Sequence, residues 1–399
     1  MKRQLSDLRG ASRLAIDATI GLTELVEALH QNIARLPGAA GVTHPRRARG
    51  ITGLVYRAVR GVTSLVGGGI DAVLARLLPM LDEATPSPGR EAVLAALNGV
   101  LGDYLVATQN PLAISMRLRR NGRPLDLARQ SLAATIEQPT AKLAVLVHGL
   151  CLNDLQWQRQ GHDHGAALAR DLGYTPIYLH YNSGLHVSSN GRAFASLIEV
   201  LLEQWPVAVE ELVMIGHSMG GLVSRSACHY GAESGHKWPT QLRKLVFLGT
   251  PHHGAPLERG GHWVDVILGT SPYTAPFARL GKIRSAGVTD LRHGSLLDED
   301  WEGRDRFADS RDLRRPVPLP DRVECYAIAA TTGKRAGDLS DRLLGDGLVR
   351  VSSALGRHAD PRLALSFPES RQWIGYGMNH LDLLSRPEVY AAIRRWLAS

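Results

Sequence analysis

The sequence predicts an α/β protein built on a mostly parallel, eight-stranded sheet with helices on both faces. Short apolar runs recur after residue 111, and helical patterns separate many of them; the runs are Leu143–Val147, Pro176–Leu179, Leu212–Ile215, Leu245–Leu248, Val323–Ile328 and Trp373–Tyr376. Buried strands that alternate with helices are typical of a parallel sheet covered on both faces. Before them, the alternating stretch Leu112–Arg119 ends at Asn121-Gly122, a strong hairpin signal. With that hairpin we count eight strands.

Residues 1–110 are predicted to form a separate helical N-terminal region. Apolar residues from Leu14 to Leu36 recur at helical spacing, and further helical patterns cover 51–66, 70–81 and about 90–108. Six arginines and one acid, Asp71, lie between Arg46 and Arg76. This basic stretch has two interpretations. The helices either contact an anionic membrane surface peripherally or pack against the remaining domain with their arginines in solvent.

The composition bounds the class of protein. The chain has 399 residues, 44% of them hydrophobic, which is enough for a large core. The 46 basic and 38 acidic residues give a charge of +8, but they are interspersed, so we expect no nucleic-acid binding. Three cysteines, no recognisable signal peptide and no long uncharged apolar run favour a cytoplasmic protein without a spanning helix. The oligomeric state is left open.

The fifth predicted strand runs directly into Gly216-His217-Ser218-Met219-Gly220-Gly221, and a helical pattern follows. A serine at such a strand–turn–helix sits on a strained backbone that exposes its hydroxyl at the sheet edge. The two flanking glycines let strand and helix approach each other. The alternative is a chance Gly-Ser turn, but the strand before it and the helix after it favour a nucleophile elbow with Ser218 as the nucleophile.

A serine nucleophile needs a base and an acid, and in this architecture they follow it in the order acid, then histidine. The acid should follow the seventh strand, where Asp346 stands between two glycines; Asp338 and Asp341 are rivals nearer the strand end. The histidine should follow the eighth strand, where His380 stands. Ser218, Asp346 and His380 are therefore the predicted catalytic triad.

The predicted oxyanion hole consists of two backbone N–H groups. One belongs to Met219, next to the nucleophile, and the other to Leu150, after the third strand. His148 is expected to brace that turn, and Cys151 to pack in the core. Metal binding has weak support, because His162-Asp163-His164 lacks a complementary cluster, and we expect neither a metal nor a cofactor.

A long polar segment follows the sixth strand. Residues 252–320 are rich in Arg, Asp, Gly and Pro, and connections of this length are usually functional or disordered. We interpret this insertion as a cap over the active site, with a passive surface excursion as the alternative. The predicted organisation is a helical region at 1–110 and a catalytic domain at 111–399 that contains this cap.

These motifs together resemble the α/β-hydrolase superfamily, and specifically its bacterial esterase/lipase-like proteins. The resemblance covers about residues 111–399 and rests on five segments: His148-Gly149-Leu150, Gly216–Gly221, Leu248-Gly249-Thr250-Pro251-His252-His253-Gly254, Gly345–Val349 and Asn379-His380-Leu381. The third segment is similar to one in phosphatidylinositol-deacylating and triacylglycerol lipases. The resemblance implies hydrolysis of carboxylic esters, with Ser218, Asp346 and His380 in the matching positions.

The predicted function is a serine esterase or lipase that acts on acyl esters or lipids with apolar chains. Leu150, Met219, Leu222 and His252 are the residues expected to border the substrate. Two alternatives stay open. One is an acyl thioesterase or acyltransferase that uses the same triad, and the other is a non-catalytic hydrolase-fold scaffold that binds a partner or a membrane through its N-terminal helices.

Overall fold

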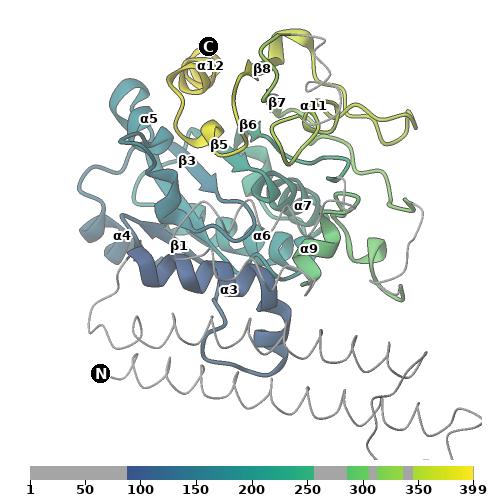
Figure 1. Ribbon diagram of the computed structural model, residues 1–399. Helices are drawn as coiled ribbons and strands as arrows, with labels where there is room; N and C mark the ends of the chain where they lie inside the picture. Colours follow the sequence, from purple (N-terminus) through teal and green to yellow (C-terminus); the bar gives the residue numbers. More distant parts are fainter. Residues whose placement is uncertain (1–87, 256–284, 305–311, 336–344, 399) are drawn as a thin grey trace, which may run out of the picture.

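The computed structural model describes residues 88–255, 285–304, 312–335 and 345–398 (Figure 1). Several predictions lie outside these residues: the helices within 1–87, the basic stretch from Arg46 to Arg76, most of the cap, and the rival acids Asp338 and Asp341. The described part contains one eight-stranded sheet in the order β2-β1-β4-β3-β5-β6-β7-β8. Its strands are β1 Arg117–Arg120, β2 Arg123–Pro124, β3 Lys142–Val147, β4 Thr175–His180, β5 Glu211–His217, β6 Leu242–Leu248, β7 Glu324–Thr331 and β8 Gln372–Tyr376.

The sheet is parallel from β4 to β8, and only β1 runs in the opposite direction. β1 pairs antiparallel with both β2 and β4, whereas β3, β5, β6, β7 and β8 pair in parallel. The apolar runs that predicted strands form the centre of this sheet, and β3, β5 and β6 are buried almost throughout. The prediction of a mostly parallel, eight-stranded sheet is confirmed, including the position of the serine turn after the fifth strand.

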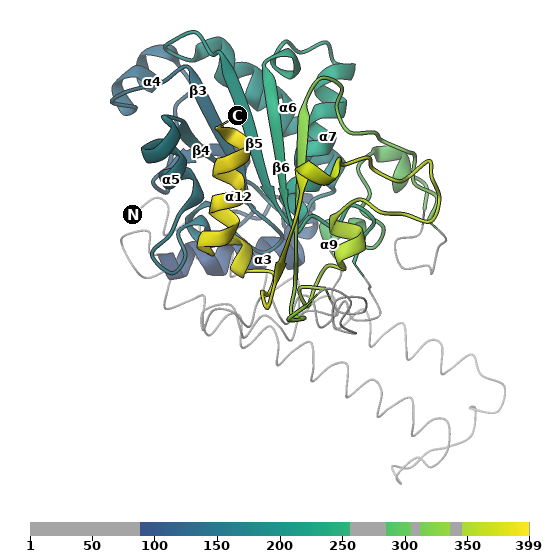
Figure 2. The ribbon, with the colours of Figure 1, turned by 90° about the horizontal axis from the view of Figure 1, so that it is seen from above.

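Helices cover both faces of the sheet, as Figure 2 shows. α5 and α12 lie on one face, and α6 and α7 pack together on the other. The α-helices are α3 Pro88–Ala107, α4 Arg129–Thr135, α5 His164–Leu172, α6 Val187–Gln204, α7 Met219–Glu233, α9 Ala286–Asp290, α11 Val351–Ala354 and α12 Pro387–Leu397. The short 3-10 helices are η1 Asp154–Trp157, η2 Trp238–Thr240, η5 Asp298–Asp300, η6 Glu369–Arg371 and η7 Asp382–Leu384. In the described part of the chain, no helix is long and apolar enough to cross a membrane.

The opening strand is shorter than the sequence pattern predicts. Residues 112–116 were expected to belong to it, but β1 begins only at Arg117. The buried Asn98 side chain of α3 donates to the Leu112 carbonyl at 2.9 Å and accepts from the Ile114 N–H at 2.9 Å. These bonds satisfy backbone groups that would otherwise pair with a neighbouring strand. The alternating pattern of residues 112–116 therefore reflects packing against a helix.

Helix α3 lies along the edge of the sheet where the loops after β3 and β4 emerge (Figure 1). Its Gly102 carbonyl accepts a hydrogen bond from Asn182 Nδ2 at 3.1 Å, in the loop after β4. Its Gly99 carbonyl accepts one from Ser285 Oγ at 2.7 Å, at the start of α9. The predicted domain boundary at residue 110 therefore lies between α3 and three segments that it contacts, namely residues 112–114, the loop after β4 and the start of α9. That boundary stays a prediction, because it concerns mainly residues 1–87.

Candidate active site

The turn after β5 has the geometry expected of a nucleophile elbow. Ser218 has φ 54° and ψ −125°, a strained combination for a residue with a side chain, and α7 begins at the next residue. A Cβ added to Gly216 would lie 2.5 Å from the Gly221 Cα, so strand and helix pass too close for any side chain there. The Ser218 hydroxyl is buried and has no hydrogen-bond partner among the described residues.

The predicted acid and base are in direct contact. His380, on the loop after β8, lies with its Nδ1 atom 2.6 Å from Asp346 Oδ2, and both side chains are buried. The His380 N–H also donates to the Asp346 carbonyl at 3.2 Å. The other oxygen, Asp346 Oδ1, accepts the N–H groups of Leu348 and Val349 at 3.0 and 2.8 Å. The carboxylate is therefore fixed on both sides and faces the imidazole.

The end of β6 brings Ser218 and His380 to the same place. The Ser218 N–H donates to the Leu248 carbonyl at 2.8 Å. At the neighbouring Gly249, which has a positive φ of 59°, an added Cβ would lie 3.0 Å from His380 Cε1. Consecutive residues of one strand end thus contact Ser218 on one side and the His380 ring on the other.

His217 connects the nucleophile turn to the histidine loop. Its Nε2 lies 3.2 Å from the His380 carbonyl, and the two ring centroids are 4.7 Å apart. Burial, followed by the nearby His380, holds the pKa of His217 well below its usual range, so the ring is neutral. A neutral ring has one N–H, and the contact with a carbonyl places it on Nε2. No role for His217 was evident from its position in the sequence.

The turn after β3 lies against Ser218. A Cβ added to Gly149 would be 2.9 Å from Ser218 Cβ, so this residue must be glycine for the turn to come so close. The backbone N–H groups of Leu150 and Met219 have no hydrogen-bond acceptor among the described residues. Both residues are fully buried. Two N–H groups that flank the serine and lack acceptors are the arrangement that an oxyanion hole requires.

His148 braces this turn, as the sequence predicts. Its Nδ1 contacts the Gly149 carbonyl at 2.9 Å, and its ring stacks on Tyr181 with centroids 4.3 Å apart. Tyr181 in turn donates its hydroxyl to the His148 carbonyl at 2.8 Å. Burial lowers the pKa of His148 to about 3, so the ring is neutral and acts through packing and hydrogen bonds.

Sequence reasoning missed the segment after β4 that supports the same turn. Ser183 Oγ accepts the Cys151 N–H at 3.0 Å, and Cys151 has a positive φ of 58°. Burial raises the pKa of the Cys151 thiol to about 12, in keeping with its predicted packing role. The available signal was the polar run Tyr181–Gly184, which directly follows a buried parallel strand.

The expected substrate-bordering residues divide into two groups. Leu150 and Met219 adjoin the nucleophile, and Leu222 is buried one turn further along α7. His252 lies elsewhere in its contacts: Arg225 Nη1 is 3.3 Å from its Nδ1, and its ring packs edge-on against Phe247 with centroids 4.6 Å apart. These contacts are those of a core histidine, and a role for His252 in substrate binding stays a prediction.

The His162-Asp163-His164 segment forms an internal cluster. The two histidine rings contact each other, with Nε2 of His162 2.8 Å from Nδ1 of His164, while Asp163 caps α5 by accepting the Ala166 N–H at 2.9 Å. The described ranges contain no group of three or more side chains suited to hold a metal ion. The segment therefore has a structural explanation.

The sheet order, the elbow after β5 and the acid–histidine pair after β7 and β8 are those of the α/β-hydrolase fold. The sequence model described as a PGAP1-like alpha/beta domain matches residues 180–314, less than half of the chain. No curated protein sequence matches significantly.

Several solved structures are similar at low identity. Aspergillus fumigatus lipase B is 11% identical, with 82% of this chain and 79% of that chain covered and a TM-score of 0.40. An esterase of Pyrococcus furiosus is 14% identical, with 65% and 82% covered and a TM-score of 0.39. Phospholipase PlaB of Legionella pneumophila is 15% identical, with 53% and 45% covered and a TM-score of 0.36. We take the class from the topology and the site, and not from these similarities.

Proposed function

We propose that the protein is a serine hydrolase that cleaves carboxylic esters through an acyl-enzyme intermediate. The observation that carries this proposal is the buried contact of 2.6 Å between His380 Nδ1 and Asp346 Oδ2, beside a serine on a strained elbow. A structural turn needs neither the strain at Ser218 nor a charged partner for a buried imidazole. The combination is what a triad requires.

The proposed reaction assigns one role to each group. Ser218 Oγ attacks the acyl carbonyl carbon, and His380 Nε2 takes the hydroxyl proton and then gives it to the leaving alcohol. Water then attacks the acyl-enzyme, with His380 again as the base, and releases the carboxylic acid and free Ser218. Asp346 keeps the Nδ1 proton of His380 in place and stabilises the charged ring. The N–H groups of Leu150 and Met219 stabilise the oxyanion.

The substrates that we propose are esters with apolar acyl chains, including lipids. Support comes from the side chains around the nucleophile, because Leu150, Met219 and Leu222 are apolar and buried there. Peripheral membrane contact through the basic stretch at Arg46–Arg76, and a cytoplasmic location, stay predictions from the sequence.

A Ser218→Ala variant tests the nucleophile. We expect kcat for a series of p-nitrophenyl esters, from acetate to laurate, to fall by up to about 10^6-fold. A fluorophosphonate probe should label the wild type and not the variant, which tests the serine even when no ester of the series fits. Ser224→Ala is a matched control, because Ser224 lies on α7 and donates only to the Gly220 carbonyl at 2.8 Å.

Equal hydrolysis and equal labelling of the wild type and Ser218→Ala would contradict the proposal. Absence of labelling in the folded wild type would instead favour a non-catalytic scaffold. Labelling together with turnover confined to acyl-CoA substrates would favour a thioesterase with the same triad.

A further inference from the structure

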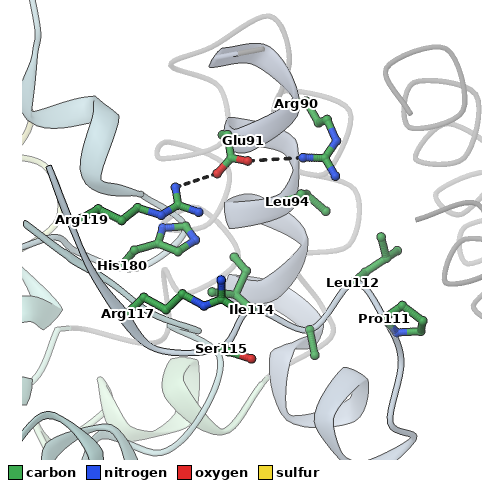
Figure 3. A pocket seen from close by; sticks show the side chains of 11 residues that line it. Arg90, Glu91, Leu94, Pro111, Leu112, Ile114, Ser115, Arg117, Arg119 and His180 are labelled. Atoms are coloured by element: carbon green, nitrogen blue, oxygen red, sulfur yellow. Dashed lines mark hydrogen bonds and ion pairs between the residues drawn. The ribbon is translucent and has the colours of Figure 1, made fainter. Parts of the chain in front are cut away.

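A second polar site lies between α3 and the β1–β4 edge of the sheet, apart from Ser218. It is a cavity of about 270 Å³ (Figure 3). Arg119 and His180 extend into this region from β1 and β4, and Arg90 and Glu91 come from the first turn of α3. Arg117 also lines the cavity and is the exposed member of this group.

Arg119 is a buried cation, and its ion-pair partners contact only one of its two terminal nitrogens. Its side chain is 5% exposed, and its Nη1 lies 2.8 Å from Glu91 Oε2 and 3.2 Å from Asp154 Oδ1. Its Nε is buried without a hydrogen-bond partner among the described residues, and its hydrogen bonds there all involve Nη1, which leaves Nη2 without one. A guanidinium can form bonds along both of its edges, so Nη2 is available to a ligand in the cavity.

His180 adds a second buried polar group. Its Nδ1 lies 3.2 Å from Asp154 Oδ1, and its side chain is 5% exposed. Burial alone raises the pKa of Asp154, but the His180 ring and the Arg119 guanidinium together hold it below its usual value, so Asp154 is ionised. The ionised carboxylate lies beside Nδ1 without an aligned hydrogen bond to it, and Nε2 is the second polar atom of the ring.

Arginines outnumber carboxylates in the lining of the cavity. Three guanidinium groups line it, from Arg90, Arg117 and Arg119, against the single carboxylate of Glu91. Arg90 and Arg119 are buried and lie beside the carboxylates of Glu91 and Asp154, so these buried charges are matched within the protein. Arg117 is exposed and adds a further positive charge at the cavity, which favours an anion there. An apolar wall that includes Leu94, Leu112 and Ile114 borders the same space.

We propose that this cavity is a binding site for an oxyanion, a carboxylate or phosphate group. Arg119 Nη2 and Arg117 donate to its oxygens, with His180 beside them. The volume fits such a group with a few attached carbons, and the apolar wall suits the head of an amphiphile as well as a free ion. The site does not depend on the proposed esterase activity, because it contains none of the residues assigned to that reaction.

Isothermal titration of the full-length protein with inorganic phosphate and with acetate tests the site. We expect saturable binding of at least one ion. Arg117→Gln should weaken it about tenfold, as expected for loss of one charge-assisted hydrogen bond. Arg123→Gln is the matched control, because Arg123 is an exposed arginine on the adjacent β2, outside the lining. It changes the net charge equally and should leave the affinity unchanged.

A substitution that is expected to increase the anion affinity distinguishes an effect on binding from an effect on folding. Glu91→Gln removes the carboxylate from the lining, so anion affinity should increase, and a protein that merely unfolded would not bind more tightly. Titration with octanoate and with a short-chain phosphatidate shows whether the bound anion is the head of an amphiphile or a free ion. Tighter binding than the free ions identifies an amphiphile, and equal binding identifies a free anion. No saturable binding of any of the four, or equal effects of Arg117→Gln and Arg123→Gln, would overturn the proposal.

Discussion

At the scale of single residues, Asp346 illustrates how the site is fixed. One carboxylate oxygen accepts two backbone N–H groups, and the other faces His380. The Gly345-Asp346-Gly347 sequence permits this turn, since both glycines have positive φ values of 56° and 95°. The same contacts that shape the turn therefore orient the acid.

We expect Asp346→Asn to lower kcat for a p-nitrophenyl ester by about 10^4-fold while the protein stays folded. An amide at this position cannot accept and stabilise the Nδ1 proton as a carboxylate does, so the imidazole loses its orientation for the serine proton. Steady-state kinetics measure kcat, and circular dichroism shows whether the variant is folded. Asp338→Asn and Asp341→Asn should retain activity; an equal loss in either of them alone would transfer the acid role to that residue.

His217 is expected to act as a positioning residue for His380. In His217→Phe the ring is kept but the donor to the His380 carbonyl is lost, and we expect kcat to fall about tenfold with KM unchanged. His217→Gln retains a donor and should recover most of the activity. A proportional rise in KM, or equal losses in both variants, would mean that the ring acts only through packing.

At the scale of elements, α3 packs against the turn after β3, which contains the proposed oxyanion donor Leu150. A Cβ on Gly99 would lie 2.3 Å from Cys151 Sγ and 2.9 Å from the Cys151 backbone nitrogen. Helix propensity alone favours alanine over glycine by about 1 kcal/mol, so glycine here reflects the close approach and not the helix. The helix and the turn can meet only because this side chain is absent.

Gly99→Ala should therefore reduce both ester turnover and the free energy of unfolding. The expected loss of stability is about 1–3 kcal/mol, as for other overpacked sites, in spite of the better helix propensity. Urea unfolding and kcat on the same preparations measure it. Val106→Ala, on the exposed face of α3, should leave turnover unchanged. A more stable and fully active Gly99→Ala protein would show that α3 does not press on the turn.

The segment that follows the sixth strand is also anchored near this edge. Asp290, at the end of α9, accepts the Val187 N–H at 2.7 Å and lies 3.0 Å from His186 Nδ1. Trp301 stacks on His186 with centroids 3.8 Å apart and donates to Ser188 Oγ at 3.0 Å. The described part of the predicted cap is thus attached to the start of α6.

At the scale of the whole molecule, several histidines are buried as neutral rings. Burial is the first cause in each case. It lowers the pKa of His148 to about 3 and of His164 to about 4, and holds the pKa values of His217 and His252 well below the usual range. In the unfolded chain these groups take up protons near pH 6.5. The unfolded state therefore binds more protons between pH 6.5 and 4.

Stability should accordingly be greatest above pH 6.5 and fall as the pH decreases toward 4. Each such histidine contributes up to about 1.4 kcal/mol per pH unit, so His164 alone contributes about 3 kcal/mol over this range. Urea unfolding at pH 7.5, 6.0 and 5.0 measures the slope. The free energy of unfolding of His164→Gln should depend less steeply on pH than that of the wild type, by the slope that corresponds to about one proton. Parallel pH profiles for the two proteins would refute the assignment.

Local sequence patterns predicted much of the fold. The apolar runs predicted six of the eight strands, because strands buried on both faces must be apolar, and the hairpin signal predicted the other two. The pattern near Arg90–Thr108 predicted α3. The alternating pattern failed at residues 112–116, where the long-range bonds of Asn98 replaced a strand. The role of His217 was missed because it depends on a carbonyl 163 residues away.

By itself, the sequence determined the fold class, the elbow at Ser218 and the chain order of acid and histidine. Those features follow from local periodicity and from the conformations that glycines permit. Only the tertiary structure decided that Asp346 meets His380, that α3 packs against the turn after β3, and that Arg119 and His180 border a charged cavity. The reason is that each depends on contacts between segments far apart in the chain, and no local pattern encodes the distance between them.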